Sequence, residues 1–187
     1  YLLATFIRSL NPTAALALGP VPVEGKDEKF KNGFTIHAEK APSRRGVEAV
    51  LQYFTGKVTS WDELLNDIDG RRNGKGSIGG VWVSGGYKSD WVNERTAERF
   101  AGVKELVVQD LFDSPLYQRA TFQLPGGAFP EKEGSYVNFA DRLQSFRWAI
   151  RPPQGVWVEG PLYWRLLDKL GLFNARAVLD EMGAKIP

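Results

Sequence analysis

Apolar side chains recur with helical spacing at the beginning of the chain. Positions 2, 3, 6, 7 and 10 are each Leu, Phe or Ile, which places them on one face of a helix with a period of 3.6 residues. Pro12 disfavours helical geometry at Asn11, so we expect the helix to end there. Because the helix begins at the first residue without a capping side chain, we interpret the chain as a piece cut from a longer protein.

The middle of the chain alternates between short apolar runs and helical patterns. Apolar runs with β-branched or aromatic residues occupy 79–83, 106–108 and 122–124. Helices are expected to start at Asp90 and at Asp113, and Asp113 is expected to be an N-cap because Ser and Pro follow it. Strands that alternate with helices pair in parallel through right-handed crossovers. The sequence therefore predicts an α/β fold, a three-layer sandwich with a mostly parallel, doubly wound sheet.

The segments before this region predict further elements. The apolar run 14–18 is typical of a buried strand, and 34–38 alternates in the manner of a strand. A helix is expected over 46–53. Ser60 and Glu63 form the capping-box pattern at the start of another helix.

The last third of the chain has a different character. Glycine and proline punctuate 125–155, which we expect to be a long irregular loop that is functional or wraps a partner. Helices are expected over 161–183, the last of them between Asn174 and Gly183. Together with a core over about 41–125, these parts are expected to form a single domain.

Composition narrows the function classes. The chain has 187 residues, of which 43% are apolar and 25% charged, and this excludes a disordered chain or a coiled coil. It has no cysteine and one histidine, His37, which excludes disulfides, an all-cysteine iron–sulfur site and an ordinary multi-histidine zinc site. We interpret His37 as a structural residue. The net charge of +2 gives no reason to expect nucleic acid as a partner, and no apolar run approaches membrane-spanning length.

Ligands of doubly wound sheets bind at the carboxyl ends of the strands, so residues after the predicted strands are candidates. The turn 84–86, Ser-Gly-Gly, could hold a phosphate, although a plain tight turn is the favoured interpretation. Several carboxylates could in principle supply acid–base chemistry: Asp110, Asp113, Glu131 and Glu133. The basic cluster Arg71, Arg72 and Lys75 is interpreted as a solvated turn, and Trp157 and Trp164 could mark a contact surface.

A longer pattern resembles a known superfamily. Its parts are VVQDLF at 107–112, ATFQLP at 120–125, AFPEKEGSYVN at 128–138 and RLQ at 142–144. Together they resemble the molybdopterin oxidoreductase superfamily over about 79–155. The continuation into PPQG at 152–155 looks most like the large iron–sulfur subunit of NADH-quinone oxidoreductase, and the sequence would be a C-terminal-side fragment of that subunit. Formate-dehydrogenase-type enzymes share much of the pattern.

The resemblance implies which residues would lie near a pterin–guanine-dinucleotide cofactor. By position these are Gly85, Gly86, Asp110 and Asn138, with Glu131 and Gly134 shaping the loop beneath and Arg142 and Gln144 ending the motif. Three departures weaken cofactor binding. Tyr87 stands where Asn is usual, and the Asp of the third strand is absent at 120–122. The usual Glu-Gly-Arg is Ala-Asp-Arg at 140–142, without the Gly.

The resemblance therefore implies a structural, non-catalytic domain of the large subunit of a respiratory NADH-quinone oxidoreductase. Its iron–sulfur clusters would lie elsewhere in the subunit. Its partners would be the rest of that subunit and neighbouring subunits, on the cytoplasmic peripheral arm of a membrane-bound bacterial complex, without direct membrane insertion. The alternative is a domain that binds molybdopterin guanine dinucleotide in an enzyme such as a formate dehydrogenase. An independent nucleotide- or phosphate-binding module is a third hypothesis.

Overall fold

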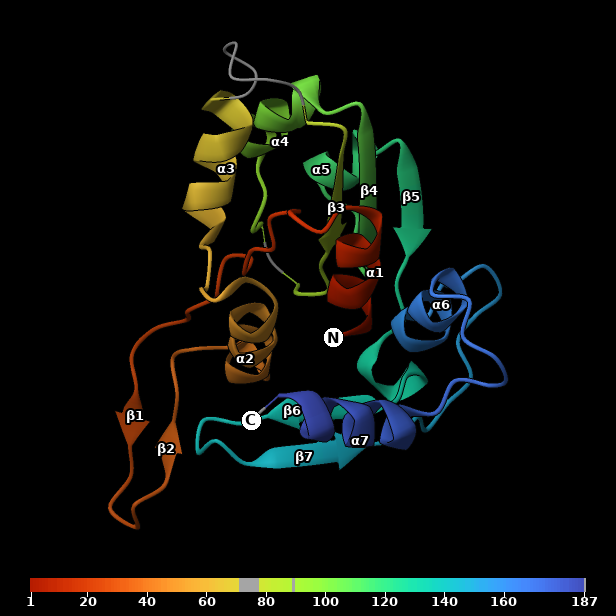
Figure 1. The fold of residues 1–187 in the computed structure, drawn as a ribbon. Coiled ribbons are helices and arrows are strands. Elements are labelled where there is room, and N and C mark those ends of the chain that lie inside the picture. The colour runs from red at the N-terminus through yellow and green to blue at the C-terminus, as the bar shows by residue number, and fades with distance from the viewer. Residues whose placement is uncertain (71–77, 89, 187) are drawn as a thin grey trace.

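The computed structural model describes residues 1–70, 78–88 and 90–186 (Figure 1). The helices are α1 (Leu2–Leu10), α2 (Arg44–Thr55), α3 (Trp61–Gly70), α4 (Glu94–Glu98), α5 (Pro115–Gln118), α6 (Glu159–Leu166) and α7 (Ala175–Lys185), with short 3-10 turns η2 (Arg99–Gly102) and η3 (Phe129–Glu131). The strands are β1 (Glu28–Lys29), β2 (Thr35–Ile36), β3 (Gly80–Ser84), β4 (Glu105–Asp110), β5 (Phe122–Pro125), β6 (Gly134–Val137) and β7 (Leu143–Phe146).

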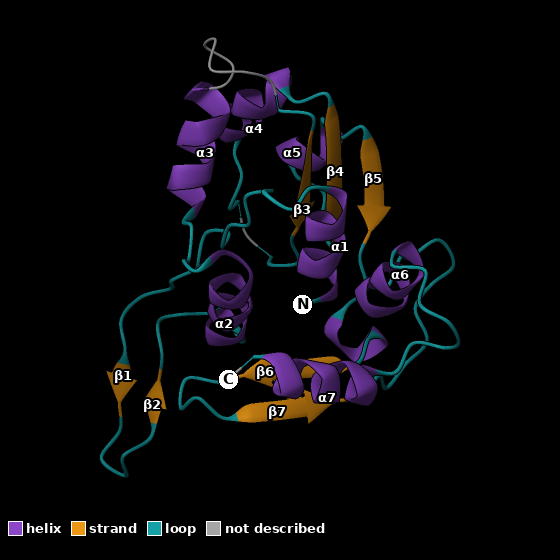
Figure 2. Cartoon of the chain, viewed as in Figure 1, coloured by secondary structure: helices purple, strands orange, loops and turns teal. Residues whose placement is uncertain are grey.

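The central sheet contains three parallel strands in the order β3-β4-β5 (Figure 2). Val81 pairs with Leu106, and Val108 pairs with Gln123. The strand order follows the chain, because α4 with η2 connects β3 to β4 and α5 connects β4 to β5. This confirms the predicted α/β class with a parallel sheet.

Side chains of the sheet alternate between two hydrophobic layers, as the pleat of a strand requires. Val83 and Val108 pack with Leu116 of α5 and the buried faces of α3 and α4. On the opposite face, Trp82 packs against a second cluster that includes Leu2 of α1 and Tyr163 of α6. Each fully buried aliphatic side chain contributes about 1.5–3 kcal/mol, so the sheet is held by apolar burial on both faces.

Side-chain hydrogen bonds at the N-termini of three helices, α3, α4 and α5, test the predicted helix starts. The capping box is confirmed, because the Glu63 carboxylate accepts from the Ser60 amide at 2.7 Å and the Ser60 hydroxyl accepts from the Glu63 amide at 3.2 Å. The prediction of Asp113 as N-cap is wrong. Ser114 caps α5 by accepting from the Tyr117 amide at 3.1 Å, because it directly precedes Pro115 at the first helical position. The helix expected from Asp90 begins later, after an Asn93 cap.

Other predicted elements differ in extent. The run 14–18 forms one isolated bridge, Ala17 to Thr59, and not a strand, because no second strand runs alongside it among the described residues. Of 34–38, only Thr35–Ile36 is strand. Helix α7 passes through Gly183 to Lys185, so the expected end at Gly183 is wrong. Gly183 does not adopt the positive φ with which a glycine ends a helix. The turn with Arg71, Arg72 and Lys75 lies outside the described residues.

The segment 125–155 contains a β-hairpin that the sequence did not predict. Strands β6 and β7 pair antiparallel, with Tyr136 opposite Gln144. The rings of Phe129, Tyr136 and Phe146 pack against one another, with centroids 4.7 Å apart for Tyr136–Phe146 and 4.8 Å for Phe129–Phe146. Aromatic packing therefore supports strands that are only four residues long.

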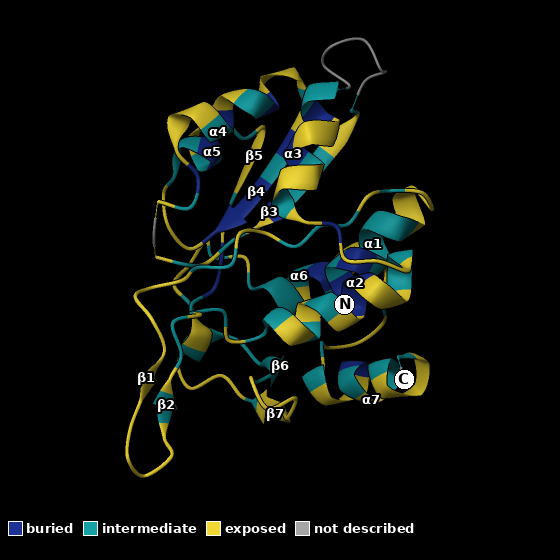
Figure 3. Cartoon of the chain, turned by 90° about the vertical axis from the view of Figure 1, so that its left-hand side faces the viewer, coloured by how far each residue is buried: buried dark blue, intermediate teal, exposed yellow. Residues whose placement is uncertain are grey.

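Residues 22–40 project from the body as an antiparallel arm, which contains β1 and β2 (Figures 1 and 3). Phe30 and Phe34 face each other near its tip and are 48% and 59% exposed. We refer to residues 22–40 as the arm. Separately, none of the helices among the described residues is both long and apolar enough to span a lipid bilayer.

Candidate functional site

The carboxyl ends of the three parallel strands meet around Asp110, the last residue of β4. The Gly85 amide, just after β3, donates to the carbonyl of Gln109 at 2.8 Å. The Gly126 amide, just after β5, donates to the carbonyl of Asp110 at 2.8 Å. The structure therefore brings together Gly85 and Asp110 of the predicted site and adds Gly126 to them.

The Asp110 side chain is buried at this junction, with 3% of the residue exposed. Its Oδ1 accepts from the backbone amides of Leu111 at 2.6 Å and Phe112 at 3.3 Å. Its Oδ2 is buried and has no hydrogen-bond partner among the described residues. Burial raises the pKa of the Asp110 carboxyl, against the opposing effect of those amides and of the Trp91 side chain. Asp110 is thus a buried acid whose Oδ2 has no hydrogen-bond partner in the part of the chain that the structure describes.

The glycines around Asp110 differ in the space available for a side chain and in their backbone conformation. A Cβ on Gly85 would lie 2.4 Å from Asp110 Oδ2, so the carboxylate occupies the space of a side chain. A Cβ on Gly126 would come within 3.4 Å of the Asp110 carbonyl carbon. Gly86 has a φ of +140° and open space where its Cβ would be. Gly85 permits close packing onto Asp110, whereas a Cβ on Gly126 would make only an ordinary van der Waals contact. Gly86 gives the loop a backbone conformation that other residues rarely adopt.

Gln109 anchors the opposite face of β4 at the same level, a role that the sequence did not reveal. It is 1% exposed, its Oε1 accepts a short hydrogen bond from the Tyr163 hydroxyl, and its Nε2 donates to the carbonyl of Trp157 at 2.7 Å. Burial raises the pKa of Tyr163, so the hydroxyl stays protonated. One sequence feature could have identified Gln109: it is a polar residue at the end of the apolar part of a predicted buried strand, VVQD, where a polar side chain needs a hydrogen-bond partner.

An ion pair lies beside the end of β5. Lys132 Nζ is 2.7 Å from Glu159 Oε1, and both side chains are mostly buried. The second oxygen, Glu159 Oε2, is buried without a hydrogen bond, and a Cβ on Gly127 would lie 3.6 Å from it. Glu131, a predicted loop residue, accepts from the Ala128 amide at 2.8 Å and so fixes the turn at η3.

Asn138 organises the turn between β6 and β7. Its Oδ1 accepts from the amides of Ala140 at 2.9 Å and Arg142 at 3.0 Å, and its Nδ2 donates to Gln144 at 3.0 Å. These contacts all lie within the hairpin and not at Asp110. Gly134 lets the Phe146 ring approach, because a Cβ there would lie 3.3 Å from it. A cofactor role for Asn138 stays a prediction.

Two residues of the arm contact the loops of the predicted site. The Tyr87 hydroxyl donates to Glu24 at 2.5 Å, and this hydrogen bond raises the pKa of Tyr87. His37 Nδ1 lies 3.1 Å from Asp27, and the His37 ring lies 4.7 Å from that of Phe139, next to Asn138. His37 thus has a polar partner and an aromatic neighbour, as a structural histidine does.

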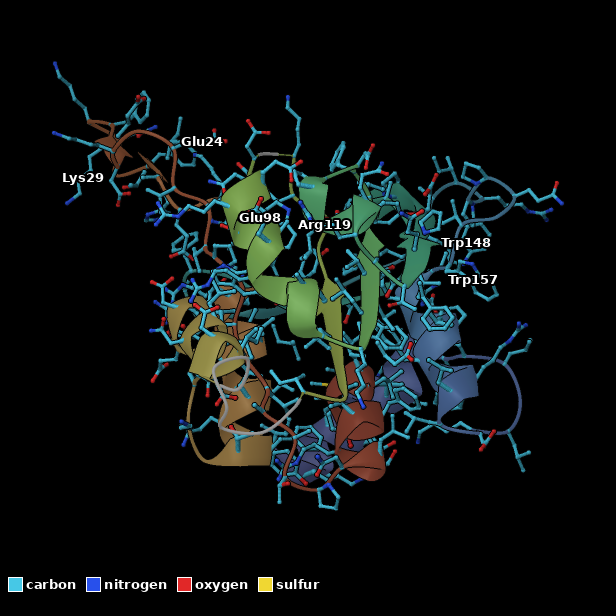
Figure 4. All side chains as sticks on the ribbon, turned by 90° about the horizontal axis from the view of Figure 1, so that it is seen from above. Glu24, Lys29, Glu98, Arg119, Trp148 and Trp157 are labelled. Carbon is cyan, nitrogen blue, oxygen red and sulfur yellow. The ribbon has the colours of Figure 1, made fainter. Side chains whose placement is uncertain are left out.

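The tryptophans proposed as contact residues differ in exposure. Trp157 is 45% exposed at the end of an isolated bridge to Gly126, and Trp148 is 55% exposed on the same side of the molecule (Figure 4). Trp164 instead packs on the second hydrophobic cluster, against Phe173. Trp157 therefore fits a contact surface, and Trp164 contributes to the core.

A cavity of about 310 Å³ lies at the other edge of the sheet. Its lining includes Phe100, Leu106, Arg119 and Thr121, which lie near the amino ends of β4 and β5. Arg119 is paired with Glu94 at 3.1 Å. The cavity is thus remote from the strand ends that carry Asp110, and it does not contribute to the candidate site.

No protein-family model matches the chain. Part of the chain is similar to the F420-dependent formate dehydrogenase subunit alpha of Methanocaldococcus jannaschii, with 35% identity over 78 residues, 40% of this chain and 12% of the relative. The F420-dependent formate dehydrogenase 1 subunit alpha of Methanococcus maripaludis is 32% identical over 88 residues, 44% of this chain and 13% of the relative. The formate dehydrogenase 2 counterpart is 30% identical over 87 residues. The matched segments thus span about an eighth of these relatives.

These similarities support the coarser part of the resemblance. Formate-dehydrogenase-type enzymes share the pattern of the molybdopterin oxidoreductase superfamily that the sequence resembles, and the relatives are formate dehydrogenases by name. They give no support to the finer assignment to the large subunit of NADH-quinone oxidoreductase.

Proposed function

We propose that this chain is a cofactor-facing α/β lobe of a molybdopterin-dependent oxidoreductase of the formate dehydrogenase type. The observation that carries the proposal is the buried Asp110 at the meeting point of three parallel strand ends. Its Oδ2 has no hydrogen bond to any described residue. Buried polar atoms are nearly always paired in native proteins, so an unpaired carboxylate oxygen favours a ligand group there. The partial similarity to formate dehydrogenase alpha subunits supports this class of enzyme.

The residues at the strand ends fit a dinucleotide that carries N–H groups and phosphates. Asp110, with its raised pKa, can accept from an N–H group as a carboxylate or donate a proton as an acid. Gly86 leaves open space beside the loop backbone, which lets a phosphate approach the amides. When bound, the cofactor would supply the redox chemistry at its metal. This chain would hold and orient the cofactor, and we assign no catalytic residue to it.

The test is cofactor content of the full-length protein that contains this chain, purified from cells able to make the molybdenum cofactor. We expect molybdenum and a releasable guanine nucleotide in the wild type, and a loss of about tenfold in both for Asp110→Asn, which replaces the unpaired oxygen with an amide of similar shape. Asp113→Asn is the matched control, because Asp113 is exposed and its carboxylate accepts from the exposed Gln118 side chain, away from the strand ends. Metal-free, pterin-free wild-type protein would reject the proposal.

A second candidate function is a non-catalytic lobe of a NADH-quinone oxidoreductase large subunit. The observation in its favour is Tyr87, which replaces the Asn usual in the superfamily and whose hydroxyl is already held by Glu24. On this proposal the chain lies on the cytoplasmic peripheral arm of a membrane-bound complex, and its iron–sulfur clusters lie elsewhere in the subunit. The same metal analysis separates the two candidates, because this one expects no molybdenum.

Both candidates place the chain within a larger assembly. The relatives are named as alpha subunits, and we propose that this chain likewise contacts the rest of its own subunit and neighbouring subunits. Large apolar side chains are available for such contacts, since Trp148 and Trp157 are about half exposed and Leu170 and Leu172 are each 93% exposed.

A further inference from the structure

The arm connects two loops of the candidate site that are far apart in the sequence. One is the loop 85–88, which follows β3, and the other is the turn 138–142, which joins β6 to β7. Glu24, on the first side of the arm, accepts from the Tyr87 hydroxyl at 2.5 Å. His37, on the returning side, packs its ring 4.7 Å from that of Phe139. In Figure 4, Glu24 lies on the part of the arm nearer the body, and Lys29 lies farther out.

Hydrogen bonds between the two sides of the arm hold its base together, so a displacement at one of these contacts also displaces the other. The Glu24 amide donates to the carbonyl of Ala38 at 2.8 Å, and the Lys40 amide donates to the carbonyl of Pro22 at 2.8 Å. The Asp27 carboxylate contacts both His37 Nδ1 at 3.1 Å and the Ala38 amide at 2.9 Å. Tyr87, Glu24, Ala38, His37 and Phe139 therefore form one continuous series of contacts between the two loops.

We infer that the arm is a strap that sets the relative position of the loop 85–88 and the turn 138–142, with Glu24 and His37 as its positioning residues. This gives a structural role to Tyr87, the departure from the superfamily pattern, because its hydroxyl is the attachment point of the strap. The turn has a second attachment, since Arg45 pairs with Asp141 at 2.7 Å. Weakening the contacts of the arm should therefore change the position of the turn 138–142 without detaching it from the rest of the protein. The inference rests on the proposed function only in treating the two loops as parts of one site.

The experiment is amide hydrogen exchange on the 187-residue protein without any ligand. The reporter amides are hydrogen-bonded on both sides of the strap: Gly85 to Gln109 in one loop, and Ala140 and Arg142 to Asn138 in the other. For Glu24→Gln we expect exchange to accelerate about fivefold at Gly85 and about twofold at the two turn amides, because a charged hydrogen-bond acceptor becomes a neutral one.

Two further variants make the result decisive. Tyr87→Phe removes the same hydrogen bond from the other partner and should reproduce both accelerations. Glu28→Gln changes an exposed carboxylate farther out on the arm and should change neither. If amide exchange accelerated only in the loop 85–88, or if Glu28→Gln had an equal effect, the inference that the arm connects the two loops would be wrong. The measurement uses no cofactor, so a failure of cofactor binding in the full-length protein leaves its outcome unaffected.

Discussion

Replacing Gly85 with Ala tests the packing at the centre of the candidate site. The new Cβ would lie 2.4 Å from Asp110 Oδ2 and 2.7 Å from its Cγ, closer than non-bonded atoms approach in folded proteins. Either the loop after β3 moves or the carboxylate rotates. Rotation would strain the hydrogen bonds that Oδ1 accepts from Leu111 and Phe112. Both routes are costly because Asp110 is buried.

The expected magnitude follows from these two routes. Overpacking a buried site costs about 1–3 kcal/mol, and weakening a hydrogen bond to a buried carboxylate costs a similar amount. We expect Gly85→Ala to lower the free energy of unfolding by about 2–3 kcal/mol, which corresponds to a fall in Tm of roughly 4–12 °C for a chain of this size. Urea unfolding followed by tryptophan fluorescence measures the effect, since the chain has 6 tryptophans.

Two controls decide whether the cause is the contact with Asp110. Gly79→Ala adds the same Cβ where no atom of the described residues lies within 4 Å, and it should change stability by less than about 0.5 kcal/mol. In Gly85→Ala combined with Asp110→Ala, the space is vacated, so the cost of the two changes together should be less than the sum of the single costs by about 1 kcal/mol or more. Additive costs, or a Gly85→Ala variant as stable as Gly79→Ala, would refute the reasoning.

Three further predictions concern single residues. Because burial raises the pKa of Asp110, the folded state retains the proton to a higher pH than the unfolded state, and the stability of the wild type relative to Asp110→Asn should fall as the pH rises above the ordinary value of 3.8. Urea midpoints at pH 4 and pH 7 check this, and an unchanged or rising difference contradicts it. Ser114→Ala should destabilise by about 1 kcal/mol through loss of the N-cap, and Asp113→Ala by less than half as much, as measured by thermal unfolding. If Asp113→Ala proves the more costly, the capping assignment is wrong. Tyr163→Phe leaves Gln109 Oε1 buried without its donor and should cost about 1–3 kcal/mol in chemical unfolding, and a neutral effect would mean that water replaces the hydroxyl.

Local patterns predicted the elements whose signals lie within a few residues. The helical spacing at 2–10 gave α1, and Ser60 with Glu63 gave the start of α3, because both depend on neighbours three or four positions apart. The three parallel strands were predicted from apolar runs between helical patterns. The hairpin β6–β7 was not predicted, because its strands are short and are stabilised by ring packing with Phe129 from outside the hairpin.

The candidate site was predicted only where strand ends define it. Asp110 and Gly85 are close because they end neighbouring parallel strands, which topology alone requires. Asn138 could not be placed this way, since its surroundings depend on a hairpin that sequence patterns did not show. The contact of Gln109 with Tyr163 joins residues 54 positions apart in different elements, and no local pattern encodes such a pairing.

The second hydrophobic cluster is built from the two ends of the chain. Leu2 of α1 packs with Val178 of α7 and with Tyr163, and the Tyr1 hydroxyl donates to Glu181, 180 positions away, at 2.7 Å. This layer joins described residues that are 180 positions apart, so it closes only after α7 has been synthesised. Until then the apolar surface of Leu2 and Tyr163 that packs with Val178 stays open to solvent and to other apolar surfaces. A nascent chain that stalls before α7 therefore leaves this apolar surface uncovered, which favours aggregation.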